Sequence, residues 1–458
     1  MTPNYSRIAV LDIGKTNAKV VVLDSATGVE VAVARTPNTV LKDGLYPHYD
    51  IDNLWSFTLD ALRSFAKEPG FDAISITTHG ASAALLDRAG SLAMPVLDYE
   101  YEYPAHIRDA YARLRPPFEE TFSPHQNMGL NIGAQLHYQK TAFPDDFAKV
   151  ATILTYPQYW TARLTGIVSN EVTSLGCHTD LWNPRDGCYS SLVDTLGVRD
   201  LMAPIRSAFD PLGPVLPDIA EAIGFTGEIP VYCGIHDSNA SLLPHLIDRT
   251  APFAVVSTGT WVINFGVGGD LDHLDPKRDT LANVDAYGRA VPSSRFMGGR
   301  EFEAIAGEIG HVDKQEVATA IEQVIAKGLM LLANVVPGSG PFPGKSACWV
   351  NAQGATAEER YAALCLYLAL MNQACLDLIG AQGPVIVEGP FALNDSYLVL
   401  LAALTSRDVI AVPGSTGTSQ GAALLTGIKP PVGVERLITP STIPGLDAYR
   451  QAWNTAMA

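Results

Sequence analysis

The N-terminal part of the chain alternates short apolar runs with polar turns. Ile8 to Asp12 and Lys19 to Asp24 are mostly apolar, and Glu30 to Thr36 alternates strictly between apolar and polar side chains. Runs of this length and period predict three consecutive antiparallel strands. Helical spacing follows over Leu54 to Ala66, and a short apolar strand over Phe71 to Thr77. The predicted order is therefore three strands, a helix, a strand and a loop.

A similar order returns in the second half of the chain. Phe253 to Val256 predicts a strand, and Trp261 to Val267 predicts its returning partner after a turn of small residues. Pro384 to Val387 then repeats the strand that precedes the loop, and Val409 to Val412 repeats the strand of Ile229 to Cys233. The repeat predicts an internal duplication. We expect an α/β protein with two similar domains facing a central cleft, at residues 1–246 and 247–458.

Composition narrows the class of partner. The 458 residues are 47% hydrophobic and 17% charged, with a net charge of -17, which repels nucleic-acid backbones and anionic lipid surfaces. The longest uncharged stretch, Ala251 to Gly269, contains Pro252 and several glycines, so it predicts strands and turns rather than a membrane span. Met1 to Arg7 does not resemble an export signal, and the six cysteines include no CxxC pair. We expect a cytoplasmic protein without nucleic-acid or membrane partners.

Two turns carry candidate phosphate chemistry. The first turn holds Asp12, Gly14 and Thr16, so a carboxylate lies beside exposed N–H donors and a hydroxyl. Such N–H groups bind phosphate oxygens, and a carboxylate holds Mg²⁺ directly or through water. Alone, an Asp-Gly turn is more often only a turn. The small residues of 257–260 stand in the matching place of the second half, so two hairpins are available to grip a polyphosphate.

Asp237 follows an apolar strand and precedes a helix. A carboxylate there can be a general base for an alcohol, or it can be the N-cap of the helix without any chemistry. Between Met94 and Trp182 the chain is irregular and rich in aromatic and polar groups, including Asp98, Tyr99 and Glu100. Such a segment often builds a substrate pocket, although its aromatic residues also suit packing against the main sheet.

The motifs together resemble the FGGY family of carbohydrate kinases, in the actin-like and hexokinase-like superfamily, over nearly the whole chain. The resemblance implies two actin-like (ribonuclease H-like) domains, the first for sugar binding and catalysis and the second for the nucleotide. It is carried by Asp12-Ile-Gly-Lys-Thr-Asn-Ala-Lys19, Thr78-His79-Gly80 followed by Leu85-Leu86-Asp87, Gly234-Ile-His-Asp237, Ser257-Thr-Gly-Thr260, and Glu388-Gly389-Pro390 with Asn394.

Residue roles follow from the resemblance. It implies ATP and Mg²⁺ as cofactors, Asp237 as the catalytic base, and Asp12 and Asp237 as metal contacts. The sugar contacts implied are His79, Gly80, Asp98, Tyr99, Glu100 and His236. The nucleotide and phosphate contacts implied are Asp12, Gly14, Thr16, Asn17, Lys19, Thr258, Gly259, Thr260, Gly389, Pro390 and Asn394, with the loop 414–421 completing the nucleotide wall.

Two positions depart from the family's pattern. Lys15 stands where a small hydroxyl residue or Ala is common, and it either reaches a phosphate or points into solvent; we expect solvent. Pro390 replaces a glycine, which removes one N–H and stiffens the loop. His236 and Asn17 resemble the L-fuculose and L-rhamnulose kinase branch more than the glycerol or xylulose kinases.

The expected activity is ATP-dependent phosphorylation of a terminal hydroxyl of a ketose, a 6-deoxyketohexose such as L-fuculose or L-rhamnulose. A pentulose, tetrulose or polyol kinase of the same family is the nearest alternative. A catalytically inactive sugar or nucleotide sensor is an alternative of another class, and an actin-like filament or chaperone ATPase is a third. The expected partner is a small-molecule sugar, with the protein a monomer or homodimer.

Overall fold

The computed structural model describes residues 5–414, 417–429 and 434–458, which form two compact units. The described residues within 1–249, 282–290 and 416–431 belong to unit 1. Those within 250–281, 291–415 and 432–458 belong to unit 2. The first long segment of unit 1 ends at Arg249. Described residues of two later segments, 282–290 and 416–431, also belong to this unit. The separate sugar and nucleotide roles of domains 1–246 and 247–458 stay a prediction.

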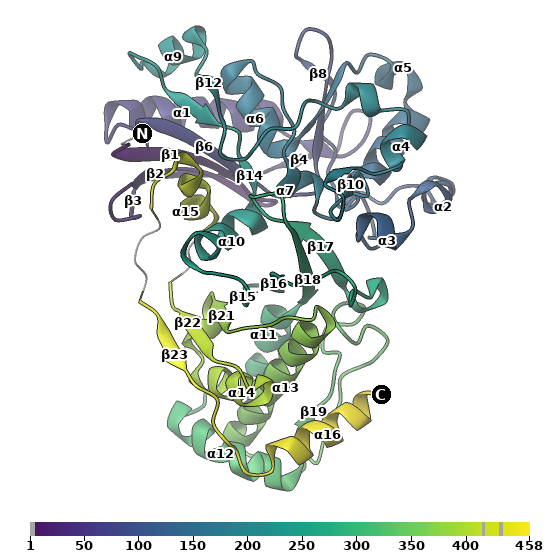
Figure 1. Cartoon of the computed structure of the whole chain (residues 1–458), viewed down its shortest axis with the longest axis vertical. Coiled ribbons are helices and arrows are strands. Elements are labelled where there is room, and N and C mark those ends of the chain that lie inside the picture. Colours follow the sequence, from purple (N-terminus) through teal and green to yellow (C-terminus); the bar gives the residue numbers. More distant parts are fainter. Residues whose placement is uncertain (1–4, 415–416, 430–433) are drawn as a thin grey trace. The chain divides into compact units, whose positions relative to one another are not determined.

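Unit 1 is built on one mixed sheet, seen at the top of Figure 1. The first three strands are antiparallel, as their hydrophobic pattern predicts, and the strand before the loop pairs parallel to the first. In spatial order the strands are β12 (Pro211–Pro214), β13 (Pro230–Tyr232), β6 (Ala73–Thr78), β1 (Arg7–Ile13), β2 (Asn17–Asp24) and β3 (Glu30–Pro37), with β14 (Ile235–His236) also on β6.

Unit 2 repeats this sheet. From its antiparallel side, the strand order β18-β16-β15-β21-β22-β23 has the same directions as β3-β2-β1-β6-β13-β12 of unit 1. The predicted duplication is therefore confirmed. The strands are β15 (Phe253–Thr258), β16 (Val262–Val267), β18 (Ala290–Phe296), β21 (Val385–Glu388), β22 (Val409–Val412) and β23 (Arg436–Ile438). Next to β18 lies β17 (Thr280–Val284), which begins in the segment of unit 2 and ends in the segment 282–290 assigned to unit 1.

Helices cover the sheet of unit 1, and much of the segment 94–182 packs in a second apolar cluster that includes Tyr103 and Leu136. Helix α1 begins where the Asp50 side chain accepts a hydrogen bond from the N–H of Asn53, and it buries Leu54 and Leu62 on the sheet. Trp160 is fully buried in the main apolar core of unit 1, so it packs with the residues of the sheet rather than lining a pocket. The helices are α1 (Ile51–Lys67), α2 (Ala105–Leu114), α3 (Phe118–Thr121), α4 (Ile132–Ala142), α5 (Pro144–Phe147), α6 (Tyr156–Thr165), α7 (Val172–Leu175), α8 (Leu192–Thr195), α9 (Pro217–Ile223), α10 (Asp237–Asp248) and α15 (Thr418–Ala423).

Short strand pairs complete the two units. They are β4 (Val40–Leu41) with β5 (His48–Tyr49), β7 (Ala83–Leu86) with β8 (Leu92–Met94) and β9 (Thr152–Thr155), β10 (Trp182–Asn183) with β11 (Cys188–Tyr189), and β19 (Met330–Leu331) with β20 (Trp349–Val350).

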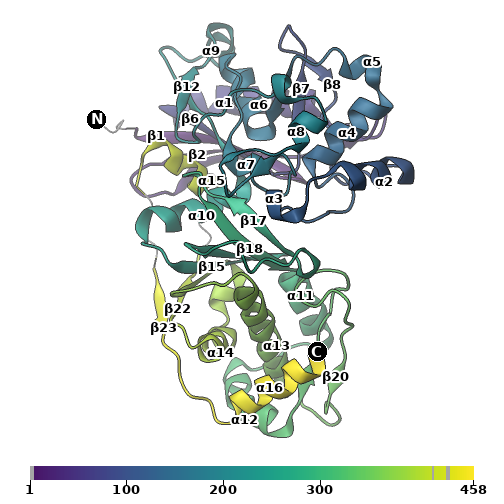
Figure 2. The same ribbon diagram turned by 45° about the vertical axis from the view of Figure 1, so that its right-hand side comes forward.

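Helix α13 is the centre of unit 2, as the turned view of Figure 2 shows. Thr356 and Glu359 close its N-terminus with a reciprocal capping box. By length and composition α13 could cross a membrane, but 72% of its apolar window is buried inside the protein, which is the environment of a core helix. The helices of this unit are α11 (Gly298–Ile309), α12 (Lys314–Lys327), α13 (Ala357–Leu378), α14 (Asp395–Thr405) and α16 (Leu446–Met457).

A buried carboxylate links α11 to α13. The Glu301 side chain accepts hydrogen bonds from the Tyr367 hydroxyl at 2.9 Å and from the N–H of Val336 at 3.3 Å. Burial raises the pKa of Glu301 from its ordinary value of 4.5 to about 7, although both hydrogen bonds act in the opposite direction. Between pH 4.5 and about 7, Glu301 is therefore protonated in the folded protein and ionised in the unfolded chain.

Replacing Glu301 with Gln should flatten the dependence of stability on pH. Because the folded pKa lies above the unfolded value, the stabilisation is complete below pH 4.5 and is lost as pH rises through about 7. A shift of this size corresponds to about 3 kcal/mol between those limits. Thermal unfolding midpoints at several pH values between 4.5 and 8 would measure it. Glu308→Gln, at an exposed site on the same helix, is the matched control; equal slopes in the two variants would contradict the prediction.

Candidate active site

Asp12, the last residue but one of strand β1, contacts helix α15 of unit 1. Its carboxylate accepts hydrogen bonds from the Ser419 hydroxyl at 2.6 Å and from the Thr418 hydroxyl, and the Lys19 ammonium lies 3.5 Å away. One carboxylate oxygen, Oδ2, makes all three contacts. The sequence analysis assigned Thr418 and Ser419 only to the small-residue loop 414–421, of which residues 415 and 416 lie outside the described residues.

The turn after Asp12 is held by backbone and amide hydrogen bonds. The N–H of Gly14 donates to the carbonyl of Asn17 at 2.9 Å, and the Asn17 amide donates to the Thr16 hydroxyl at 3.1 Å. Asn38 pins the turn from outside, because its side-chain amide donates to the Gly14 carbonyl at 2.9 Å. Thr16 and Asn17 remain exposed. The turn therefore has a fixed backbone with exposed polar side chains at its tip.

Asp237 is the first residue of α10, and His236 occupies the N-cap position. The alternative that Asp237 is only an N-cap is therefore wrong. Its carboxylate oxygen Oδ1 accepts from the N–H of Ser238 at 2.6 Å and lies 3.1 Å from His236 Nε2. Burial by itself would raise the pKa of Asp237, but the hydrogen bond and charge of His236 outweigh burial and lower it. Asp237 is thus an ionised carboxylate.

A buried polar group supports His236 from behind. The Cys177 thiol hydrogen-bonds to His178 and His236; burial would raise its pKa, but the two histidines lower it to about 5. The backbone N–H of His236 donates to the Thr173 hydroxyl at 3.1 Å, and that hydroxyl donates to Glu171. From the sequence, the cysteines are predicted to be ordinary reduced thiols, and the contact of Cys177 with His236 was not predicted. Its neighbour in sequence, His178, is the only local signal.

His79 lies in an aromatic enclosure in the same unit. Its ring centroid is 5.1 Å from that of Tyr49, 5.4 Å from Tyr99 and 5.0 Å from Tyr156. Burial lowers the pKa of His79 to about 4, so its ring is neutral at neutral pH, and the Asp237 charge is close enough to oppose that shift. Nδ1 hydrogen-bonds to the Gly80 carbonyl at 2.8 Å, whereas buried Nε2 has no hydrogen-bond partner among the described residues.

Gly80 lets the His79 loop approach the His236 ring. A Cβ atom on Gly80 would lie 2.7 Å from His236 Nε2, which is closer than real Cβ contacts. The tight contact explains why a residue without a side chain follows His79. It also joins the two loops that the sequence analysis assigned to the sugar and to catalysis.

Lys15 corrects a prediction. Its side chain is only 17% exposed, and its ammonium pairs with Asp98 and lies 3.5 Å from Glu100. The same ammonium lies 5.0 Å from the ring centre of Tyr49 and 4.9 Å from that of Tyr99. The expectation that Lys15 points into solvent is therefore wrong, because two carboxylates and two aromatic faces attract the cation inward.

Asp98 and Glu100 differ in how much of each carboxylate is free. Asp98 Oδ1 accepts from Lys15, from the N–H of Glu100 at 3.2 Å and from the Tyr49 hydroxyl at 3.5 Å. The Glu100 side chain is 56% exposed. Unit 1 therefore brings Asp98, Tyr99 and Glu100 together with Lys15, and Lys15 connects them to the turn that follows Asp12.

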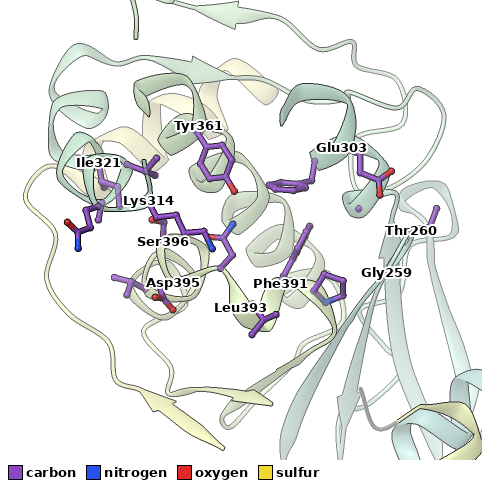
Figure 3. A pocket seen from close by; sticks show the side chains of 18 residues that line it. Gly259, Thr260, Glu303, Lys314, Ile321, Tyr361, Phe391, Leu393, Asp395 and Ser396 are labelled. Atoms are coloured by element: carbon purple, nitrogen blue, oxygen red, sulfur yellow. The ribbon is translucent and has the colours of Figure 1, made fainter. Parts of the chain in front are cut away.

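Unit 2 contains a cavity of about 740 Å³, drawn in Figure 3. Gly259 and Thr260 lie at one end of this cavity and Ile321 at the other, with the Tyr361 and Phe391 rings between them. Four predicted nucleotide contacts line it: Gly259, Thr260, Pro390 and Asn394. The sequence analysis missed the lining residues Gly299, Phe302, Glu303, Lys314, Gln315, Val317, Ala318, Ile321, Tyr361, Phe391, Leu393, Asp395, Ser396 and Val399.

The other predicted nucleotide contacts in unit 2, Thr258 and Gly389, do not line the cavity but hold the backbone of β15 and β21 together. A Cβ on Gly389 would lie 2.0 Å from the Thr258 carbonyl oxygen, so this glycine permits β15 and β21 to approach. The Thr258 hydroxyl donates to the Glu388 carbonyl at 2.5 Å. Asn394 reaches the cavity wall, but its side-chain oxygen accepts from the N–H of Tyr397 at 3.1 Å and caps α14.

Helix α11 begins against the turn between β15 and β16. A Cβ on Gly299 would lie 1.8 Å from the Gly259 carbonyl oxygen, and both glycines line the cavity. The first turn of a helix carries N–H groups without intrahelical partners, which suit anionic oxygens. The glycine pair 298–299 before a helical pattern is the sequence signal that could have identified this element.

Gly299→Ala should disturb the cavity. The added methyl group meets backbone, which has no way to move aside without shifting α11 from the β15–β16 turn. We expect a lower unfolding midpoint and at least about a tenfold loss of nucleotide affinity, which corresponds to 1.4 kcal/mol. Calorimetric titration with ADP would measure the affinity. Gly307→Ala, in the same helix with nothing within 4 Å of its added Cβ, should keep wild-type affinity; parallel losses in both variants would contradict the argument.

Comparison with known proteins follows the two units. Residues 7–244 match the N-terminal domain of the FGGY family of carbohydrate kinases, and residues 250–433 match the carbohydrate kinase FGGY C-terminal domain. An L-fuculokinase of Salmonella typhi is 27% identical over 58% of this chain and 57% of its own length. A rhamnulokinase of Halalkalibacterium halodurans is 24% identical over 56% of this chain and 55% of its own length. The chain thus spans little more than half the length of these curated relatives.

Solved structures extend the comparison over both units. A carbohydrate kinase from Novosphingobium aromaticivorans has a TM-score of 0.91 and 37% identity, covering 98% of this chain and 100% of that one. A xylulose kinase from Rhodospirillum rubrum has a TM-score of 0.79 at 18% identity over 98% of each chain, which is a likeness of fold alone. The expected α/β class with two actin-like domains is confirmed. With matches to both of its domain models, the chain belongs to the FGGY family of carbohydrate kinases.

Proposed function

We propose that this protein transfers the γ-phosphoryl group of ATP to a terminal hydroxyl of a ketose. The observation that carries the proposal is the ionised, half-enclosed carboxylate of Asp237 beside a neutral imidazole with an unpaired ring nitrogen. Asp237 Oδ1 is held by Ser238 and His236, and His79 Nε2 lacks a partner among the described residues. Because the neutral His79 ring donates its Nδ1–H to the Gly80 carbonyl, Nε2 is an acceptor like the Asp237 carboxylate. The two groups therefore suit two hydroxyls of a polyhydroxylated substrate, each of which donates one hydrogen bond.

The proposed substrate is a 6-deoxyketohexose such as L-fuculose or L-rhamnulose. Relatives named L-fuculokinase and rhamnulokinase support this class, although they match little more than half of their own length. The partly exposed ring of Tyr99 beside His79 also supports it, since the C–H groups of a sugar pack on aromatic faces. A pentulose, tetrulose or polyol would use the same polar groups with less apolar contact.

The cavity of unit 2 suits an adenine nucleotide. Its rings from Phe302, Tyr361 and Phe391 and its aliphatic side chains offer an apolar surface for a flat base. Gly259, Thr260 and the start of α11 lie at one end of the cavity, where N–H donors suit phosphate oxygens. Pro390 replaces one such donor by an apolar ring, so its loop contributes packing rather than an additional N–H.

The carboxylates of unit 1 suit a Mg²⁺ ion that keeps several of its waters. Among the described residues there is no group of three or more His, Cys, Asp or Glu side chains able to hold a metal ion. Mg²⁺ commonly keeps several waters and takes one or two protein carboxylates together with substrate phosphates. Asp12 would offer the oxygen that Ser419 and Thr418 leave free, and Asp237 would contact the ion through one of its waters, which leaves its second oxygen to the substrate. A bound Mg²⁺ would neutralise charge on the phosphoryl oxygens.

In the proposed step Asp237 orients the attacking hydroxyl and receives its proton. The hydroxyl oxygen forms a bond to the γ-phosphorus while the bond from that phosphorus to the β–γ bridging oxygen breaks, which releases ADP. His236 and Ser238 fix the carboxylate, so its other oxygen is available to the hydroxyl. The low pKa of Asp237 makes it a weak base, which suits a loose transition state in which the hydroxyl loses its proton late.

Asp237→Asn should lower sugar-dependent turnover by at least about 10²-fold, as expected when general-base assistance is removed. Nucleotide binding should remain, because the cavity of unit 2 does not include this residue. A coupled ADP-release assay with Mg²⁺ and ATP over ketoses, 6-deoxyketoses, tetruloses and polyols would measure turnover and name the substrate.

The matched control is Asp248→Asn, at the exposed end of the same helix, which should keep full turnover. Near-wild-type turnover of Asp237→Asn would contradict the proposed base. ADP release that needs no sugar would favour an ATPase. Sugar and nucleotide binding without turnover in the wild-type protein would favour a sensor.

A further inference from the structure

Lys15 lies in the sugar site assigned above rather than at the phosphates. It belongs to the turn after Asp12, yet its ammonium contacts Asp98 and Glu100 and lies between the rings of Tyr49 and Tyr99. Its charge is also felt at His79, where it opposes protonation. A lysine in the turn after Asp12 therefore belongs to the cluster of Tyr49, Asp98, Tyr99 and Glu100.

Lys15 and Asp98 use only part of their hydrogen-bonding capacity. An ammonium has three N–H donors, and Asp98 and Glu100 account for two of the contacts made by Lys15. Asp98 Oδ1 is already saturated by Lys15, the N–H of Glu100 and the Tyr49 hydroxyl. Asp98 Oδ2 accepts no hydrogen bond among the described residues. A donor and an acceptor thus remain side by side on one ion pair.

We propose that Lys15 is a specificity-determining residue that binds a vicinal diol of the substrate together with Asp98. The inference rests on the proposed sugar kinase function. One hydroxyl of the diol donates to Asp98, and the ammonium donates to an oxygen of the neighbouring hydroxyl. Hydrogen bonds in which one partner is ionised are stronger than neutral ones, so the ion pair discriminates between a diol and a deoxy analogue.

The charge balance also defines which sugars are excluded. Asp98, Glu100 and Asp237 contribute three negative charges around Tyr99 and His79, against the positive charges of Lys15 and His236. Lys15 is already paired with carboxylates, so it does not attract a further anion. The substrate class is a neutral polyhydroxylated ketose, and a sugar acid of the same length is rejected.

Direct binding tests the inference separately from catalysis. Calorimetric titrations of L-fuculose, L-rhamnulose, D-xylulose, a deoxy analogue of the best of these, and gluconate would be made with wild-type protein, Lys15→Met and Lys15→Arg. Methionine keeps an unbranched side chain between the two rings but removes the ammonium, and arginine retains the positive charge. Lys140→Met is the matched control, because Lys140 also lies over an aromatic ring, Phe147, and hydrogen-bonds to the Leu196 carbonyl.

We expect Lys15→Met to lose at least about tenfold in ketose affinity and to bind the deoxy analogue no more weakly than the ketose, since a charged hydrogen bond contributes at least about tenfold. Lys15→Arg should recover part of the affinity, and gluconate should not bind the wild-type protein. In steady-state assays the ketose KM should rise, while the KM for ATP stays constant. Unfolding midpoints would confirm that each variant is folded.

Equal ketose affinity of wild-type protein and Lys15→Met would overturn the inference and leave the kinase proposal untouched. Tight binding of gluconate, or no binding of any ketose by the wild-type protein, would also overturn it. A ketose that binds with the expected dependence on Lys15 but stimulates no ADP release would support the inference and contradict the proposed kinase function.

Discussion

The parallel register on strand β6 brings the candidate catalytic groups together. In β1, Asp12 and Ile13 pair with Thr77 and Thr78, and in β14 the residues Ile235 and His236 pair with the same two threonines from the other side. The three strands therefore end at one edge of the sheet, and the loops that follow carry the turn after Asp12, His79 and Asp237. A shift of one residue would turn every side chain to the opposite face, so the register determines the site.

Around this edge, burial and neighbouring charges set the protonation states of the candidate catalytic groups. His79 is kept neutral by burial, whereas Asp237 is kept ionised by His236 despite burial. Groups of opposite behaviour lie within one enclosure, which is the arrangement that acid–base chemistry at neutral pH requires. Cys177 and Thr173 contact His236 but belong to a different segment, so the geometry of Asp237 also depends on the short helix α7 and the residues that follow it.

Much of this arrangement follows from sequence patterns, and the remainder depends on tertiary contacts. The strand runs and the repeated turns predict both sheets, because hydrophobic period and small-residue turns are local properties. The orientation of Lys15 was not predictable, since its attraction comes from Asp98 and Glu100, which are far along the chain. Similarly, Tyr361 reaches the cavity from a helix whose apolar residues are typical of a core, and Cys177 has no motif that marks it.

The placement of α15 bears on how the chain is synthesised. The hydroxyls that hold Asp12 belong to Thr418 and Ser419, some four hundred residues later, and Leu424 and Leu425 complete the apolar cluster around Val10 and Leu243. The first long segment of unit 1, which ends at Arg249, emerges from the ribosome long before these residues are synthesised. Until they arrive, the nascent unit has an uncovered apolar surface and an Asp12 carboxylate without its hydroxyl partners. Unit 1 is therefore complete only after most of unit 2 has been synthesised.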